Sequence, residues 1–274
     1  MKKVLFVCDG NNFSNGAFEF LKTLNDIDSI YVKGIFFDSN DIMQFVPLSY
    51  NHSEGPYVKL MENEKPAIKQ SEDIFKERCK ESGIRFRVHE EKKEWLSDLF
   101  AKETRFADLA VFSEQLFSAD ISEIEPNTFM QEALRIAECP TILIPENFKT
   151  IDRVIVAYDG KKDSAFALKQ FCNIIPQLTE LPTEFVYIKD EDDSSIPDAE
   201  LLKEYARLHF ESLGIAKLHF DARKYFASWT EEKKNIILIA GSFGRSAVSR
   251  ILRGSFAEKI IQDHKFPIFI SHNN

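Results

Sequence analysis

The chain has few of the residues that mark disulfide-rich, fibrous or membrane-spanning proteins. Of its 274 residues only 4 are cysteine, 10 are glycine and 10 are proline. No two cysteines form a CxxC pair, so we expect reduced thiols, with Cys8 and Cys139 in the core. No apolar run reaches the ~18 residues of a membrane-spanning helix, and the run that follows Lys2 and Lys3 stops at Asp9, too soon for a signal peptide. These absences predict a soluble globular protein of the cytoplasm with no membrane partner.

The chain also lacks an excess of positive charge. It carries 35 Lys and Arg against 44 Asp and Glu, a formal net charge of −9, whereas broad nucleic-acid binding needs a basic face. We therefore expect no nucleic-acid partner.

Motifs for metal binding and catalysis are missing as well. The 6 histidines show no HxxxH or Cys/His ligand spacing. The acidic run Asp190–Asp193 lacks the glycine and the final glutamate of a calcium loop, so we interpret it as a solvated loop. Neither a nucleophile elbow nor a Walker loop is present. We assign no catalytic residue and no metal ligand.

What the sequence does contain is an internal repeat. The strand-like segment Lys3–Gly10 matches Arg153–Gly160, 150 residues later, and both segments end in Asp-Gly. At a spacing of 127 residues, Leu109–Ser113 falls on Ile236–Ala240, and Pro140–Ile144 falls on Pro267–Ser271. The first copy therefore holds 23 extra residues, which we place near Asn40–Lys65 as a loop or lid-like excursion.

Strand-like and helix-like segments alternate along both copies. The expected strands are 3–8, 29–37, 84–89, 108–113, 141–144, 152–158, 183–189, 216–220, 235–240 and 267–271. The expected helices are 14–24, 60–82, 91–103, 128–138, 163–175, 197–213, 222–233 and 255–264. The alternation predicts an α/β fold in which each copy is a five-stranded, mainly parallel sheet with helices on both faces. We place the boundary in the polar link Glu146–Thr150 and expect domains of residues 1–147 and 148–274.

Near the end of the second copy lies a glycine-punctuated segment. An apolar strand leads into Gly241 and Gly244, and nine residues later Gly254 and Ser255 open an amphipathic helix. Glycines let the backbone approach a ligand closely, and the free N–H groups of a helix N-terminus favour a phosphate. The segment has the features of an anion cradle.

This pattern resembles that of the universal stress protein family, in a tandem form that covers essentially the whole chain. The resemblance implies two flavodoxin-like domains of the adenine nucleotide alpha hydrolase type, the second binding ATP or a related nucleotide such as ADP or AMP, with Mg²⁺ as an accompanying ion. It implies a nucleotide site made of Ala157, Asp159, Ile188, Ala240, Gly241, Gly244, Gly254, Ser255 and Phe256. Arg245 lies inside the nine-residue span, as do Arg250 and Arg253, and a guanidinium there suits a phosphate.

The first copy departs from this pattern although it keeps Asp9. At the positions of Gly241, Gly244 and Gly254 it has Glu114, Phe117 and Asn127, while Thr128 stands where the second copy has Ser255. A carboxylate opposes a phosphate, and phenylalanine adds bulk where the backbone must come close. We expect the first half to lack ATP binding and to serve as a structural or partner-binding half.

The resemblance implies a role in stress response or nucleotide-linked signalling. It also implies an internal pseudo-dimer of the two halves through Thr141–Ile144 and Ile268–Ile270, and it leaves open a further homodimer and an unknown protein partner. Two alternatives stay open: a slow ATPase or nucleotidyl-transfer enzyme that uses the same site, and a nucleotide-independent interaction module.

Overall fold

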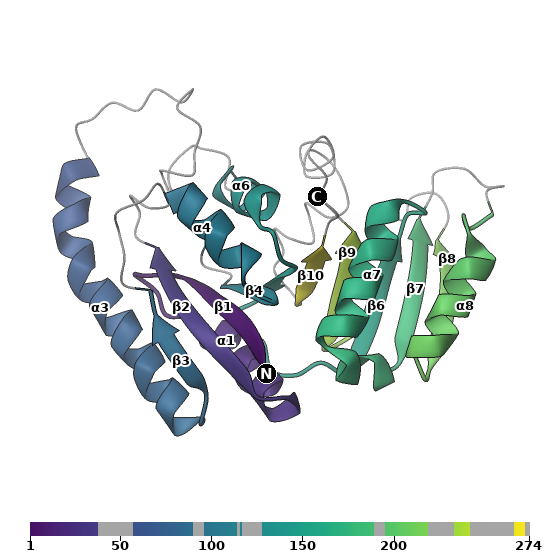
Figure 1. Cartoon of the computed structure of the whole chain (residues 1–274), viewed down its shortest axis with the longest axis horizontal. Coiled ribbons are helices and arrows are strands. Elements are labelled where there is room, and N and C mark those ends of the chain that lie inside the picture. Colours follow the sequence, from purple (N-terminus) through teal and green to yellow (C-terminus); the bar gives the residue numbers. More distant parts are fainter. Residues whose placement is uncertain are drawn as a thin grey trace. The chain divides into compact units, whose positions relative to one another are not determined.

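The computed structural model describes residues 1–37, 57–89, 96–113, 116, 128–188, 195–218, 233–241 and 266–271. The chain divides into two compact units, Met1–Phe148 and Lys149–Asn274, coloured from purple to teal and from teal to yellow in Figure 1. The division falls one residue from the predicted boundary. We describe each unit by itself.

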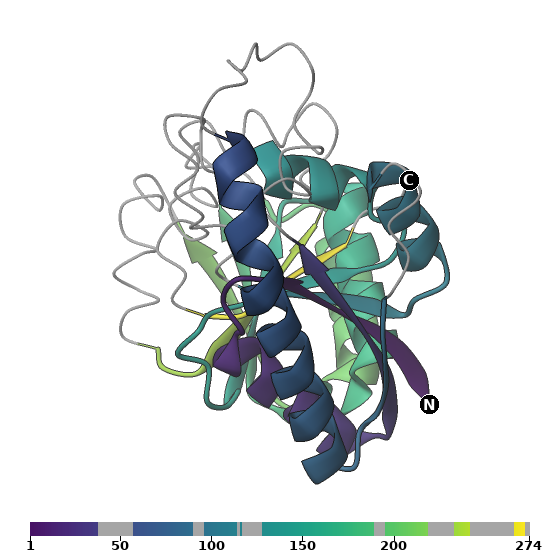
Figure 2. The same cartoon turned by 90° about the vertical axis from the view of Figure 1, so that its left-hand side faces the viewer.

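The first unit is a parallel sheet with helices on both faces. Its elements are β1 (Lys2–Asp9), α1 (Asn15–Ile27), β2 (Ile30–Phe37), α3 (Tyr57–Glu81), β3 (Arg85–Val88), α4 (Leu96–Arg105), β4 (Leu109–Ser113), α6 (Thr128–Ile136) and β5 (Thr141–Ile144). The strands lie in the order β3-β2-β1-β4-β5, and each neighbouring pair is parallel. Figure 2 shows α3 running along the strands of this unit.

Phenylalanines fill the core on both faces of this sheet. Phe6 of β1 stacks on Phe75 of α3 at 5.4 Å, and Phe75 also meets Phe18 of α1. On the other face, Phe100 of α4 packs on Phe112 of β4 at 5.8 Å. These five phenylalanines are core residues, each at most 2% exposed.

The second unit repeats the strand order of the first. Its elements are β6 (Arg153–Tyr158), α7 (Lys162–Ile174), the 3-10 helix η1 (Pro176–Glu180), β7 (Thr183–Ile188), α8 (Ala199–His209), β8 (Leu213–Leu218), β9 (Ile236–Gly241) and β10 (Ile268–Ser271). The strands lie in the order β10-β9-β6-β7-β8, again all parallel. In Figure 1, α7 and α8 lie on the same face of these strands. The predicted α/β fold is confirmed.

Several predicted boundaries differ from the structure. The helix predicted over 60–82 begins three residues earlier, at Tyr57, and includes Pro66, so residues 57–65 of the predicted excursion are helical. The helix predicted to reach residue 213 ends at His209, since Phe210 takes an extended conformation and packs edge-on against Phe185 at 5.6 Å. As a result β8 starts at Leu213 and not at residue 216. The helices predicted at 222–233 and 255–264 lie outside the described residues.

The cysteines are buried, as expected for Cys8 and Cys139. Burial raises the pKa of the Cys8, Cys79 and Cys139 thiols to about 12 and that of Cys172 to about 11. Within the described ranges, no helix is both long and apolar enough to cross a membrane. The same ranges hold no group of three His, Cys, Asp or Glu side chains placed to bind a metal ion.

Candidate functional site

The strand order of the second unit reverses between β6 and β9. The chain moves outward from β6 to β7 and β8, then returns to place β9 on the other side of β6. In open α/β sheets, ligands bind beyond the carboxyl ends of the strands at such a reversal. The register pairs Ala157 of β6 with Ala240 of β9. The structure therefore brings together four predicted site residues at this edge of the sheet: Ala157, Asp159, Ala240 and Gly241.

Asp159 stands directly after β6 in a tight turn. Its Oδ1 accepts the Lys161 backbone N–H at 3.0 Å, and its side chain is half exposed, at 50%. Gly160 has φ +76°, and a Cβ there would lie 2.6 Å from Cγ of Pro197. The turn therefore needs glycine both for its backbone conformation and for space. The Asp159 carboxylate remains accessible at the edge of the sheet.

Tyr158, the last residue of β6, fixes the chain on the other side of this turn. Its hydroxyl donates to the carbonyl oxygen of Pro197 at 3.2 Å. Burial, assisted by the charge of Asp198, raises the pKa of Tyr158, so its hydroxyl stays protonated and remains a donor.

Gly241 ends β9 against the first turn of α7. A Cβ at this position would overlap the Ser164 backbone nitrogen and lie 2.6 Å from Ser164 Cα. The contact is with backbone, which cannot rotate away as a side chain can. A residue other than glycine would push the end of β9 away from α7.

The N-terminus of α7 has no side-chain cap. Its N-cap is Lys161, which makes no capping hydrogen bond, and the Ser164 hydroxyl donates to the Lys161 carbonyl oxygen at 2.9 Å. Lysines at the positive end of a helix are unfavourable on their own, and a nearby anion relieves this. Asp163 supplies one negative charge in the first turn, and the helix end beside Gly241 would attract a further anion.

The other predicted residues are placed less closely or not at all. Ile188 is the last residue of β7, one strand away from β6. Gly244, Arg245, Gly254, Ser255 and Phe256 lie outside the described residues, as do Arg250 and Arg253. Their part in the site stays a prediction.

The corresponding edge of the first unit differs in its carboxylate. Asp9 is only 7% exposed. Its Oδ1 accepts the Asn11 backbone N–H at 2.9 Å, and its Oδ2 accepts the Asn12 side-chain amide at 2.8 Å. Its own loop therefore occupies both oxygens of Asp9. Glu114, Phe117 and Asn127 lie outside the described residues, and Thr128 begins α6.

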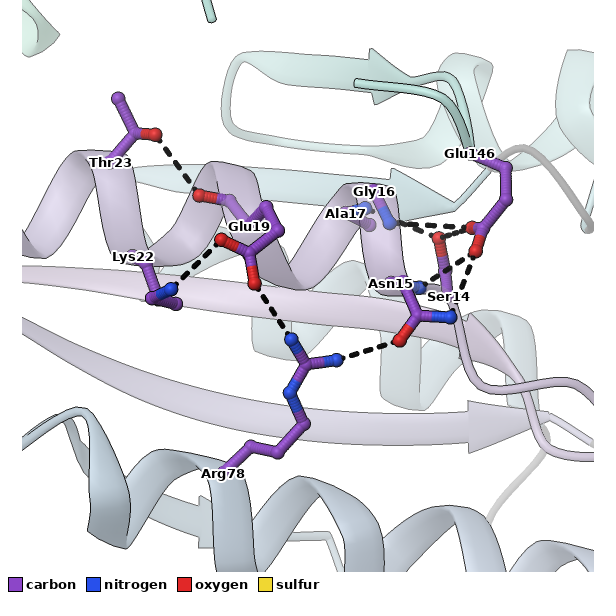
Figure 3. Close-up of polar contacts among 9 residues, drawn as sticks. All are labelled: Ser14, Asn15, Gly16, Ala17, Glu19, Lys22, Thr23, Arg78 and Glu146. Carbon is purple, nitrogen blue, oxygen red and sulfur yellow. Dashed lines mark hydrogen bonds and ion pairs between the residues drawn. The ribbon is translucent and has the colours of Figure 1, made fainter. Parts of the chain in front are cut away.

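The role of Glu146 is not predictable from its surroundings in the sequence. From the sequence, it belongs to the polar link between the halves, whereas in the structure its carboxylate lies at the N-terminus of α1, against Ser14, Asn15 and Gly16 (Figure 3). These partners are 130 or more residues away in the chain. No local spacing can reveal such a contact.

No protein-family model matches the chain. Among curated proteins, the universal stress protein Slr1230 of Synechocystis is 23% identical over 166 residues, which are 59% of this chain and 56% of that protein. The chain thus spans just over half the length of this relative.

Solved structures are similar over nearly the whole chain. A universal stress protein from Archaeoglobus fulgidus covers 99% of this chain and 96% of its own, at 16% identity and a TM-score of 0.64. A putative universal stress protein from Pseudomonas aeruginosa covers 99% and 93%, at 12% identity and a TM-score of 0.55. A universal stress protein in complex with cAMP covers 46% and 100%, at 18% identity and a TM-score of 0.35. The sequence likeness and the shared fold together confirm the predicted resemblance of this chain to the universal stress protein family.

Proposed function

We propose that this chain is a universal stress protein that binds ATP or a related adenine nucleotide through its second unit. The observation that carries the proposal is Gly241, where the end of β9 lies against the uncapped N-terminus of α7 with no room for a Cβ. Close packing of a strand end on a helix through glycine also accompanies phosphate-binding turns in other open α/β sheets, and this supports the proposal. The adenine-nucleotide assignment itself comes from the family resemblance of the glycine pattern.

In the proposed complex, different groups at this edge of the sheet bind the adenosine and the phosphates. The half-exposed carboxylate of Asp159 accepts hydrogen bonds from the hydroxyl or amino groups of the adenosine. The N–H groups of the glycine segment and of the helix N-termini receive the phosphates, assisted by Arg245. Mg²⁺ would share the phosphate oxygens, since it usually binds through substrate phosphates and few protein ligands.

The first unit is proposed to be a structural or partner-binding half. The burial of Asp9 supports this, because a carboxylate that is only 7% exposed is less accessible to an adenosine than the half-exposed carboxylate of Asp159. The pseudo-dimer through Thr141–Ile144 and Ile268–Ile270, a further homodimer, the cytoplasmic location and the role in stress response or signalling stay predictions.

Titration calorimetry of the full chain tests the proposal. We expect saturable binding of ATP, with ADP, AMP and Mg²⁺ dependence measured in the same series. Asp159→Ala should weaken ATP binding about tenfold or more, because it removes charge-assisted hydrogen bonds. Asp152→Ala is the matched control, since Asp152 is exposed at the amino end of β6, where its carboxylate accepts hydrogen bonds from Asn235 and Thr150.

Two outcomes decide against it. If binding does not saturate at millimolar nucleotide, the chain is a nucleotide-independent interaction module. If both aspartate variants lose the same amount of ATP affinity, Asp159 is not part of the site. Multiple-turnover hydrolysis of ATP with magnesium that disappears in Gly244→Glu would instead favour the enzyme alternative.

A further inference from the structure

In the first unit, a carboxylate of the chain itself sits on the N-terminus of α1 (Figure 3). Glu146 Oε2 accepts the Ser14 hydroxyl at 2.6 Å and the Gly16 backbone N–H at 3.4 Å. Its Oε1 accepts the Asn15 backbone N–H at 3.0 Å and the Asn15 side-chain amide at 3.2 Å. Both oxygens are thus bound by four donors of the first helical turn.

The chain after β5 is pressed against this turn by packing as well as by hydrogen bonds. A Cβ at Gly16 would overlap the Pro145 carbonyl oxygen and lie 2.6 Å from that of Glu146. A turn follows, in which the Phe148 N–H donates to the Pro145 carbonyl oxygen at 3.1 Å. The Phe148 ring packs edge-on against that of Phe20 in α1, with ring centroids 5.5 Å apart. The position of the Glu146 carboxylate is therefore set by backbone and core contacts on both sides of it.

The contact extends to α3 through a guanidinium. The Asn15 side-chain oxygen accepts Arg78 Nη1 at 2.8 Å, while Arg78 Nη2 pairs with Glu19 at 2.7 Å (Figure 3). The Asn15 amide group thus bridges the Glu146 carboxylate and a cation. This polarisation favours a negative charge at the helix end.

The two units treat the corresponding helix ends differently. In α1, Ser14 is the N-cap and its oxygen also accepts the Ala17 N–H at 3.2 Å, whereas α7 has a lysine N-cap without a side-chain bond. The repeat aligns Glu146 with the neutral Asn273. The first unit therefore has a carboxylate at a position that is neutral in the second unit, whose α7 instead carries Asp163 in its first turn.

We propose that Glu146 is a built-in anion that closes the α1 terminus of the first unit to external anions and locks the end of β5 to α1. The helix N-terminus and its hydroxyl cap attract negative charge. In the first unit the chain itself supplies that negative charge, so no bound anion is needed. The inference rests on contacts within the first unit and holds whether or not the second unit binds a nucleotide.

Hydrogen–deuterium exchange of the full chain, without nucleotide, tests this proposal. Glu146→Ala should raise the exchange rates of the Asn15 and Gly16 amides about tenfold, since their hydrogen bonds to the carboxylate are lost. The Ala17 amide should follow, because its acceptor Ser14 Oγ is itself held by Glu146. Formate, a free carboxylate small enough for the vacated space, should then lower these rates again in Glu146→Ala. It should have no such effect on the wild-type chain or on Glu146→Gln, whose amide fills the space.

Glu138→Ala is the matched control. Glu138 pairs with Arg105 at 2.6 Å on the surface and touches no helix N-terminus, so exchange at Asn15–Ala17 should match the wild type. Unchanged exchange in Glu146→Ala would overturn the proposal, and faster exchange that formate does not reverse would reduce Glu146 to a structural tie. Should Glu146→Ala fail to fold, Glu146→Gln decides: exchange at Asn15–Ala17 must rise several-fold, and no rise would overturn the proposal.

Discussion

Two strand glycines of the second unit, Gly241 and Gly214, face very different surroundings. A Cβ on Gly241 would overlap backbone of α7, whereas a Cβ on Gly214 in β8 would find its nearest neighbour, Cγ of Glu184, at 3.8 Å. An added methyl group therefore causes overpacking at Gly241, whereas at Gly214 it adds a side chain without a steric clash.

We expect Gly241→Ala to lower the free energy of unfolding by about 1–3 kcal/mol through overpacking. Gly214→Ala should leave the free energy of unfolding unchanged or raise it by up to about 1 kcal/mol, since it restricts the unfolded chain. Urea unfolding of both variants gives the two values. Equal effects would mean that β9 can shift away from α7 without penalty.

Glu103 of α4 is the centre of a partly buried charge cluster in the first unit. Its carboxylate pairs with Lys33 and, at 3.3 Å, with Lys3. Burial opposes the charged form, but the two ammonium groups together outweigh it and hold the pKa of Glu103 below its ordinary value. The charged form therefore stabilises the fold at neutral pH, and this contribution is lost as the pH falls through the lowered pKa.

Glu103→Gln should lower the free energy of unfolding by about 1–3 kcal/mol at pH 7, because both lysines lose a charged acceptor. The difference from the wild type should shrink as the pH falls below about 4, where the unfolded chain binds the proton first. Urea unfolding at pH 7 and pH 3 measures both differences. Glu200→Gln, on the surface at 88% exposure, should change little at either pH, and a constant Glu103 difference would contradict the linkage.

At the scale of elements, Arg78 joins α3 to α1. Its guanidinium lies 4.4 Å from the ring centre of Phe18 and 5.5 Å from that of Phe13, and it pairs with Glu19. The planar group makes ring and carboxylate contacts at once, which the compact ammonium of lysine cannot reproduce. Arg78 therefore ties the long helix to the helix whose N-terminus Glu146 occupies.

Arg78→Ala should lower the free energy of unfolding by about 1–3 kcal/mol, and Arg78→Lys should recover only a minor part of this loss. Lys80→Ala, two residues away and exposed, is expected to match the wild type. Chemical denaturation with guanidinium chloride and with urea measures the three values. Full recovery by lysine would show that charge alone matters at this position.

The elements were predictable where a single local pattern decides them. Apolar runs located β1, β4 and β5 to within one residue at each end, because a parallel strand covered on both faces needs apolar residues throughout. Helical periodicity likewise located α3, which is predicted over 60–82 and spans Tyr57–Glu81, although Pro66 lies inside it. The stripe of Ile68, Phe75 and Cys79 buries that helix, and packing of this kind overrides a local break.

At the scale of the whole molecule, the internal repeat predicted the α/β fold of both units and placed Asp159 and Gly241 at one edge of a sheet. This prediction was possible because the two copies share one strand order, so aligned residues of the two copies occupy corresponding places in their sheets. The contacts of Asp9 and Glu146 were not predictable from the repeat, since they are the points at which the copies differ. A duplicated sequence thus predicts what its halves share and not what sets them apart.

The four buried thiols provide a further prediction for the whole chain. With pKa values of about 11 to 12, fewer than about 1 in 1,000 are thiolate at pH 7.5, and thiolate is the reactive form. Iodoacetamide should leave the native chain unmodified over minutes and should modify all four cysteines in 6 M guanidinium chloride. Intact-mass spectrometry counts the adducts, and rapid labelling of the native chain would mean that these thiols become exposed in solution.

Because these four thiols are unreactive in the native fold, the chain can be labelled at introduced cysteines for spectroscopy. Two cysteines could be introduced at exposed positions, one in each unit, for example at Lys80 and Lys169. Only these two cysteines would react with a label, so the native cysteines need not be replaced. A fluorophore pair on such a variant would then report the distance between the two units in solution, and its change when ATP is added.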